Sequence, residues 1–413
     1  LAVWKTALSD QELADLTYPT PTFPTFTLDF NTIAEQFTFA RGSEATYVDA
    51  QGLIQSTASN NAPRLDYSTG AEAFLLEPQS TNLVTYSELF SNAYWNKLGS
   101  SVASGFTSPD GASNAFKLVE DSANTQHGLL RSNFPTNVQR TLSVFAKKGE
   151  NDRVFISDYN KFGSTIGVIF NLSSGIVESN QNNSVYLNTK IESYLNGWYK
   201  CSVTWTNTTG LTVPFFGNAI SGTNLYQGDG VSGIYVFGAT FEEASYATSY
   251  IKSEGSQTTR NQETCINATP EINSEEGVLY FEGSALADDL TNRFISLTDG
   301  TQNNSVCIFY GGGSSNFIRS EIKSNNITQA ELTTTNYQIT NYNKIAIKYK
   351  ENDFALWVNG TEVSTDTSGS VPIGLNDLSF DRANILTFFG NTKDVQVYTK
   401  ALSDAELIKL TTI

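Results

Sequence analysis

The sequence predicts an all-β protein made of tandem jelly-roll or β-sandwich domains, and three observations lead to this fold class. Charged residues make up only 16% of the 413 residues and aromatic residues 12%, a composition that favours strands over helices. Short alternating segments of apolar and polar residues recur along the chain, and turn residues separate them about every 10–15 positions. The length corresponds to about two or three domains.

The two ends of the sequence are similar to each other. Residues 1–17 and 395–411 are identical at nine of seventeen positions. In each, an apolar strand pattern leads to a serine that is followed three residues later by a glutamate, which predicts a helix with a capping box. We expect the second copy to close the last domain. The first has no domain before it, so we expect it to be the terminal strand and capped helix of a preceding domain in a longer parent protein.

Two segments precede the first complete domain. Residues 18–27, YPTPTFPTFT, hold three of the ten prolines and are typical of an extended linker. Residues 28–85 contain turn signals and short apolar pieces without strong periodicity. They predict an irregular β segment that packs on the domain following it.

Two larger regions alternate as strands do. The first, residues 86–262, predicts a jelly roll, with its clearest strands at 141–146, 153–156, 165–170, 198–205 and 233–241. The second, residues 272–413, predicts another sandwich, with strands at 277–282, 293–297, 305–310, 344–349 and 354–358. In the second region, Asn359-Gly360 lies between alternating runs and predicts a type I′ hairpin turn.

Charge and reactive residues exclude several classes of function. The net charge of −17 disfavours nucleic acid and anionic membrane surfaces as partners, and no apolar run is long enough to insert into a membrane. His127 is the single histidine, so neither a zinc site nor a mechanism with two histidines is expected. Three widely spaced cysteines imply no disulfide framework.

Acidic residues offer no recognisable catalytic or metal motif. None of the glutamates forms the E-x-D-x-x-E pattern of sandwich-fold glucan hydrolases, including Glu242-Glu243, Glu275-Glu276 and Glu282. We therefore expect no catalytic residue, and we expect His127 to be a hydrogen-bonding residue rather than a base. No cofactor is expected. A structural Ca²⁺ ion is the one open alternative, on Asp288-Asp289, Asp299 and Asp377, against their interpretation as solvated loop acids.

Five aromatic residues are candidates for stacking on a sugar ring, namely Tyr94, Trp95, Trp198, Tyr226 and Trp357. Tyr94, Trp95 and Tyr226 lie next to polar loops, which often carry binding residues. Trp198 and Trp205 differ by an odd number in one strand, so they face opposite sides of the sheet. Trp357 precedes the hairpin turn. Packing inside a sandwich is the competing interpretation for each of them.

Part of the sequence resembles a segment that recurs in tail-fibre and other virion proteins of tailed bacteriophages. It consists of FARGSEATYVDAQGLI at 39–54, PRLDY at 63–67, LLEP at 75–78, TNL at 81–83 and YSE at 86–88. In those proteins this segment leads into a carbohydrate-binding-like jelly roll. Landmarks similar to that jelly roll are SPDG at 108–111, NGWYK at 196–200, and ATSYI at 247–251 with Thr259-Arg260.

The last region is similar to a concanavalin A-like (laminin-G type) lectin domain. The similarity rests on LWVNG at 356–360 and ALSDAEL at 401–407. By its likeness to the C-terminus, the segment 1–17 then belongs to a preceding lectin-like domain.

Together these resemblances imply a structural or adhesive virion protein of a phage, a tail fibre or a head or tail decoration, located on the particle surface. The implied partners are host-surface polysaccharide and other virion proteins. A homo-oligomer is expected, with a trimer as one form. Two alternatives remain: the non-catalytic carbohydrate-binding region of a secreted polysaccharide-degrading enzyme, and depolymerisation of capsule polysaccharide by residues 86–262.

Overall fold

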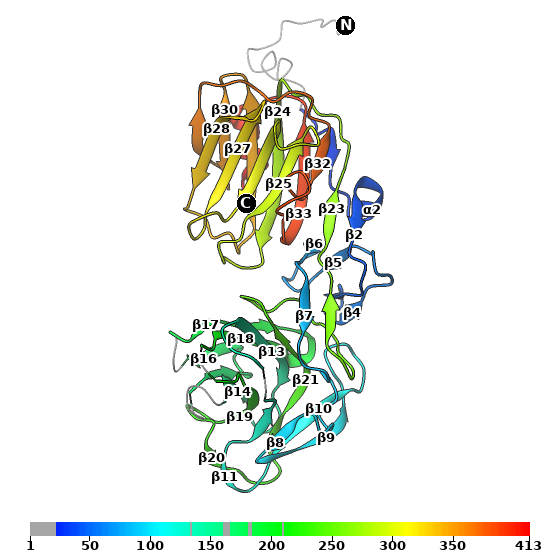
Figure 1. The fold of residues 1–413 in the computed structure, drawn as a ribbon, viewed down its shortest axis with the longest axis vertical. Helices are drawn as coiled ribbons and strands as arrows, with labels where there is room; N and C mark the ends of the chain where they lie inside the picture. The colour runs from blue at the N-terminus through cyan, green and yellow to red at the C-terminus, as the bar shows by residue number, and fades with distance from the viewer. Residues whose placement is uncertain (1–21, 133, 160–165, 181–183, 209) are drawn as a thin grey trace, which may run out of the picture.

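The computed structural model describes residues 22–413 except 133, 160–165, 181–183 and 209. The predicted segment 1–17 and the first part of the linker lie outside the described residues. The chain is all-β, as predicted, and forms two sandwiches, drawn as the lower and upper lobes in Figure 1.

The first sandwich lies in the predicted jelly-roll region and consists of two six-stranded sheets. One sheet has the order β17 (Tyr186–Ser193), β18 (Trp198–Thr206), β13 (Gln139–Lys147), β21 (Gly233–Glu242), β10 (Ala115–Glu120) and β9 (Ser100–Phe106). The other has the order β16 (Ile176–Asn180), β15 (Val168–Asn171), β14 (Arg153–Asp158), β19 (Pro214–Ala219), β12 (Gly128–Leu130) and β8 (Asn96–Leu98). We call this unit the middle sandwich.

The second unit, the C-terminal sandwich, packs an eight-stranded sheet on a five-stranded one. The main path of the larger sheet is β31 (Thr361–Asp366), β30 (Phe354–Val358), β29 (Asn343–Lys350), β24 (Glu276–Ala285), β33 (Gly390–Tyr398), β6 (Ala73–Leu76) and β5 (Arg64–Asp66), and β1 (Phe26–Thr27) also pairs with β33. The smaller sheet runs β28 (Ile327–Thr334), β27 (Ile318–Ser324), β26 (Ser305–Tyr310), β25 (Arg293–Thr298) and β32 (Asp377–Ser379).

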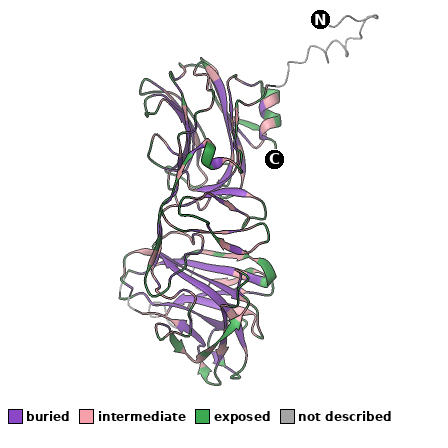
Figure 2. Ribbon diagram, turned by 90° about the vertical axis from the view of Figure 1, so that its right-hand side faces the viewer, coloured by how far each residue is buried: buried purple, intermediate pink, exposed green. Residues whose placement is uncertain are grey.

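Buried apolar side chains fill the space between the two sheets of each sandwich, as the purple strands in Figure 2 indicate. This arrangement follows from the two-residue period of a strand, because every second side chain points to the same face. In β26, for example, Val306 and Ile308 enter the main core, whereas Cys307 and Phe309 belong to a small cluster on the other face.

Residues 28–85 do not pack only on the domain that follows them, which corrects the sequence-based expectation. Their strands β1, β5 and β6 join the large sheet of the C-terminal sandwich, where Phe74 and Leu76 enter its core. Ile54 in β4 (Ile54–Ser56) packs instead on the middle sandwich. These strands hold two to four residues each and lack a periodic pattern, so the sequence did not reveal which domain they would join.

Several short two-stranded pairs lie outside the large sheets, and two of them join the segment 28–85 to residues 258–266. β2 (Thr38–Ala40) pairs with β23 (Thr264–Ile266), β7 (Ser80–Asn82) pairs with β22 (Thr258–Arg260), and β3 (Thr46–Val48) pairs with β4. A further pair joins β11 (Asn124–Thr125) to β20 (Tyr226–Gln227).

Two local predictions in the last domain are confirmed. Asn359 and Gly360 have φ angles of 50° and 81° and connect β30 to β31, as a type I′ turn requires. Helix α3 (Asp404–Thr411) begins with the capping box formed by Ser403 and Glu406. The other helical elements are the short α2 (Ile33–Gln36) and η1 (Leu195–Gly197). None of the helices among the described residues has the length and apolar character needed to cross a membrane.

The loop after β32 contains a buried acid. Asp381 is 4% exposed, and its Oδ1 has no hydrogen-bond partner in the described part of the chain. Burial, together with the nearby Asp377, raises the pKa of Asp381 to about 6. The loop also holds three non-glycine residues with positive φ, namely Ala383, Asn384 and Leu386. This loop therefore carries a carboxyl group whose neutral form is more favoured than in an ordinary aspartate.

Replacing Asp381 by asparagine should raise the free energy of unfolding at neutral pH. The pKa of Asp381 is raised, so its favourable contribution is complete below about pH 4 and is lost as the pH rises through about 6. Asparagine is neutral at every pH, so the variant keeps this contribution to stability as the pH rises. In urea unfolding, the advantage of Asp381→Asn over the wild type should grow between about pH 4 and 7.

Asp299 provides the matched control on the same sandwich. Burial acts to raise its pKa, but hydrogen bonds from Thr301 and Asn304 outweigh burial and lower it. Asp299→Asn should therefore lose stability at neutral pH. Equal, pH-independent effects of both variants would contradict this account.

Candidate functional site

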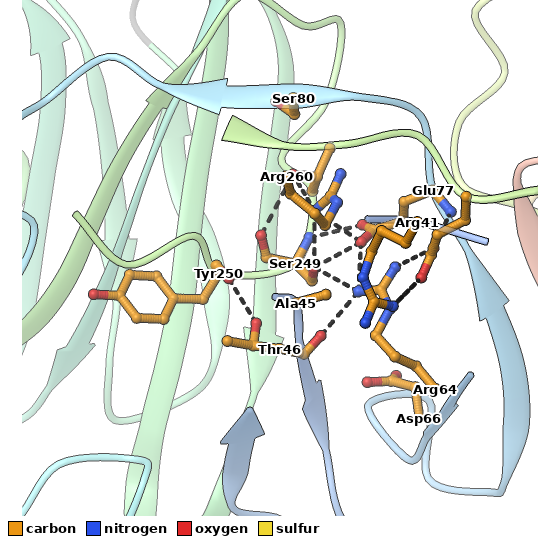
Figure 3. A network of polar contacts seen from close by, with 12 residues as sticks. Arg41, Ala45, Thr46, Arg64, Asp66, Glu77, Ser80, Ser249, Tyr250 and Arg260 are labelled. Atoms are coloured by element: carbon orange, nitrogen blue, oxygen red, sulfur yellow. Dashed lines mark hydrogen bonds and ion pairs between the residues drawn. The ribbon is translucent and has the colours of Figure 1, made fainter. Parts of the chain in front are cut away.

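Five charged side chains meet where the middle sandwich, the C-terminal sandwich and the segment 28–85 come together. We call them the junction network: Arg41, Arg64, Glu77, Arg260 and Glu263. All five are buried. Figure 3 shows the three arginines converging around Glu77 and Ser249.

Glu263, between β22 and β23, binds the two arginines of the segment 28–85. Its Oε1 accepts from Arg41 Nη1 at 2.8 Å and from Arg64 Nε at 2.9 Å. Its Oε2 accepts from Arg64 Nη2 and from the backbone N–H of Glu77. Charge-assisted hydrogen bonds of this kind are the strong ones, and here they join residues up to 222 positions apart.

Glu77, which directly follows β6, binds the other side of the network. Its Oε2 lies 2.8 Å from Arg64 Nη1 and 2.9 Å from Arg260 Nη1. Ser249 donates to the same carboxylate from its backbone N–H and its hydroxyl. Burial acts to raise the pKa of Glu77, but the neighbouring Arg260 and Arg64 outweigh it and lower the pKa to about 2.

The network has three arginines and two carboxylates, and backbone carbonyl oxygens accept the remaining guanidinium hydrogen bonds. Arg41 donates to the carbonyl oxygens of Ser43, Ser59 and Ala62, and Arg260 donates to that of Pro78. Three guanidinium groups can therefore be buried with two carboxylates. The network thereby positions distant segments of the chain against one another.

A cleft of about 1510 Å³ opens beside the junction network. Its lining comes from all three parts of the chain: Glu77 and Asp66 from the segment 28–85, residues 243–250 from the middle sandwich, and residues 284–291 from the C-terminal sandwich. Tyrosines and small polar side chains are frequent in it, among them Tyr47, Tyr194, Tyr246, Tyr342, Asn188, Ser202, Ser245 and Asn391.

Several charged groups around the cleft have partners within the protein. Lys190 lies 2.7 Å from Glu192, and the buried Lys200 donates to the carbonyl of Thr248. Two acidic residues of the lining form ion pairs with arginines that do not line the cleft. Glu243 lies 2.7 Å from Arg140, and Asp289 lies 2.7 Å from Arg293. The cleft thus presents a polar, partly aromatic surface without a concentration of free cations.

The five predicted stacking residues do not line this cleft. Trp95, Trp198 and Trp357 are at most 4% exposed and lie in three apolar clusters, where they pack as in the competing interpretation. Trp198 and Trp205 belong to different clusters, as expected for opposite faces of β18.

Two of the five keep a contact with charged groups. Tyr94 is half-buried, and the guanidinium of Arg131 covers its ring at 4.3 Å. Tyr226 is 9% exposed, and its hydroxyl donates to Glu120. The guanidinium of Arg131 thus occupies one face of the first ring, and His127 contacts the second with ring centroids 4.8 Å apart.

The remaining candidates are engaged in local structure. Ring nitrogens of the buried His127 face the carbonyls of Gly99 and Tyr226. Glu242 accepts from Ser80 and Thr248. No group of three metal-ligating side chains occurs among the residues that the structure describes, and the acids weighed for Ca²⁺ bind serine, threonine, asparagine or arginine side chains.

Sequence reasoning did not identify the junction network or the cleft. Four of the five network residues do lie in the quoted phage-like segments and landmarks, and Glu263 lies three positions after Arg260. An arginine or glutamate inside an otherwise apolar or small-residue stretch, as in LLEP at 75–78, is a signal of a buried pair. It does not say which partner the residue meets.

Comparisons with known proteins add only remote similarities. No family model matches the chain, and no curated protein matches it. Among solved structures, a CBM40 of the Ruminococcus gnavus IT-sialidase is 19% identical, over 34% of this chain and 84% of that one, with a TM-score of 0.30. A SAP-like pentraxin of Limulus polyphemus is 10% identical, over 33% and 69%, with a TM-score of 0.26.

Domains LG4-5 of the mouse laminin α1 chain are 8% identical, over 68% of this chain and 90% of that one, with a TM-score of 0.23. The evidence for the sandwich architecture of this chain is therefore the pairing and register of its own strands.

Replacing Arg64 by methionine should destabilise the protein strongly. The change leaves Glu77 and Glu263 buried with fewer cationic partners, and breaking a buried ion pair on one side costs about 3–5 kcal/mol. Chemical denaturation of the whole chain measures this loss.

Lys117→Met is the matched control, because Lys117 forms an ion pair with the mostly exposed Glu150 at 2.7 Å. Its loss should cost at most about 1 kcal/mol. If the two variants were equally stable, the junction network would not have the role assigned to it.

Proposed function

We propose that the chain is a non-catalytic, glycan-binding component of a bacteriophage virion surface, and that the cleft beside the junction network is its binding site. The single observation that carries the binding role is the cleft itself. It is large enough for an oligosaccharide, since binding pockets commonly measure about 300–1,000 Å³. Its lining combines tyrosines with many hydroxyl and amide groups.

The chemistry of the lining suits sugars. Hydroxyl and amide side chains exchange hydrogen bonds with sugar hydroxyls, and tyrosines offer both a ring face and an O–H group. Apolar side chains supply contact area for the CH faces of a sugar ring, since Leu187 and Leu290 line the cleft and are about half exposed.

Absence of catalysis is part of the proposal. Hydrolysis of a glycosidic bond normally needs two carboxyl groups placed on either side of the bond. Four acids of the cleft lining are engaged by basic groups: Glu77 in the junction network, Glu192 with Lys190, Glu243 with Arg140 and Asp289 with Arg293. A reducing-end assay on glycans that bind should detect no product, and release of oligosaccharides would overturn this part.

The virion role is supported by the sequence resemblance, whose motifs contain four of the five residues of the junction network. Host-surface polysaccharide, other virion proteins and further copies of the chain are the proposed partners. The second candidate is the carbohydrate-binding region of a secreted polysaccharide-degrading enzyme. Detection of peptides of this chain in purified phage particles would favour the virion role. Detection of the chain only as part of a polypeptide that also carries a catalytic domain would favour the enzyme-associated role.

The binding role is tested with a pair of matched variants. Leu187→Arg places a long charged side chain in the cleft, so glycan affinity measured on an array and by calorimetry should fall at least tenfold, about 1.4 kcal/mol. Ile176→Arg changes an equally exposed aliphatic residue of the same sandwich, 52% against 53% exposed, outside the cleft, and should bind as the wild type does.

Equal binding by the two variants would place the site elsewhere. Absence of binding by the wild-type chain across neutral and acidic glycans would contradict the proposal as a whole.

A further inference from the structure

We infer that the chain forms a two-fold symmetric dimer in which the edge strand β9 of one copy pairs antiparallel with β9 of a second copy. This inference concerns an interface between copies and does not depend on the proposed glycan binding. It is carried by three features of β9: its open hydrogen-bonding edge, its lack of charged residues and the opposite charges beyond its two ends.

The first feature is an unpaired backbone edge. β9 is the last strand of its six-stranded sheet and pairs with β10 on one side. Figure 1 shows it in cyan beside β10, at the margin of the lower lobe. Among the described residues, no strand pairs with its other side. In an antiparallel sheet, alternate residues of an edge strand direct their N–H and C=O groups outward, so β9 offers a row of donors and acceptors to another strand.

The second feature is the absence of a charge that would keep other strands away. Natural edge strands commonly carry such a charge. In the described structure, the other edge strands of the four large sheets, namely β5, β8, β16, β17, β28, β31 and β32, each contain at least one charged residue. β17, at the opposite edge of the same sheet, has Lys190 and Glu192. β9, with the sequence SSVASGF, has none.

This neutrality favours a second copy of the chain as the partner. Each copy has a net charge of −17, so two copies repel each other over most of their surfaces. Residues 98–109 contain no charged residue, and two copies can therefore approach along this edge. Ser101, Ala103 and Ser104 are exposed. Their small side chains leave room for a second strand at the usual spacing of about 4.8 Å.

The third feature decides the orientation. Lys97 precedes the uncharged stretch and Asp110 follows it. In an antiparallel pair, the Lys97 end of one copy lies toward the Asp110 end of the other, whereas a parallel pair would bring like charges together. Antiparallel pairing about a two-fold axis also uses the open edge of both copies and therefore stops at a dimer. It favours a dimer over the trimer considered from the sequence.

The regular part of β9 indicates which residues meet. Residues 100–104 pair with β10 without interruption, and the register shifts beyond them, where Gly105 has a φ of 97°. A dimer centred on Val102, the middle of the regular part, places Ala103 of each copy opposite Ser101 of the other. The two Ala103 residues then lie diagonally across the same exposed face, within reach of each other for long side chains.

The test measures the mass of the whole chain by analytical ultracentrifugation from about 1 to 500 µM, because a contact of this size is expected to be weak. The wild type should show a reversible monomer–dimer equilibrium. Ala103→Lys and Ala103→Glu should each raise the dissociation constant at least about tenfold, because like charges then lie across the interface. An equimolar mixture of the two variants should recover the dimer, a result that a folding defect would not produce.

Thr365→Lys is the control, since it adds the same charge to an exposed position of the edge strand β31. It should dimerise as the wild type does, and thermal unfolding verifies that each variant is folded. A wild-type chain that stays monomeric over this concentration range would overturn the inference. So would a trimer, or a dimer that neither substitution of Ala103 weakens.

Discussion

The buried contact between arginines and carboxylates at the junction is the constraint on which the arrangement of the two sandwiches depends. Each sandwich has a core of its own, but the segment 28–85 is divided between them. Both Arg64, the first residue of β5, and Glu77, which directly follows β6, belong to that segment. Arg260 and Glu263 lie on the return path between the sandwiches. Because buried charges require close partners, these chain positions are held in one geometry.

This constraint also shapes the surface. The cleft lies directly beside the junction, and Glu77 and Ser249 belong to both the network contacts and the cleft lining. A site assembled from three parts of a chain is well defined only if those parts are fixed relative to one another. The network thus provides rigidity to a surface whose own residues are largely loops and strand ends.

Aromatic residues illustrate the difference between local pattern and burial. The sequence correctly placed Trp198 and Trp205 on opposite faces of one strand, since that follows from the two-residue period. It did not reveal that both faces are covered, one by the opposing sheet and the other by residues such as Ile54 and Tyr250. Large aromatic side chains stabilise cores as effectively as they bind ligands. The residue type and its position in a strand therefore do not distinguish a core residue from a ligand-binding one.

By itself the sequence determined the elements whose causes are local. Alternation fixed most strands of both sandwiches, Asn359-Gly360 fixed a hairpin because both residues adopt positive φ, and Ser403 with Glu406 fixed the start of α3. Tertiary structure alone decided the rest. The pairing of β6 with β33, the meeting of Arg41 with Glu263 and the position of the cleft join residues hundreds of positions apart. Such contacts depend on which surfaces are buried together, and no local period of the sequence encodes that choice.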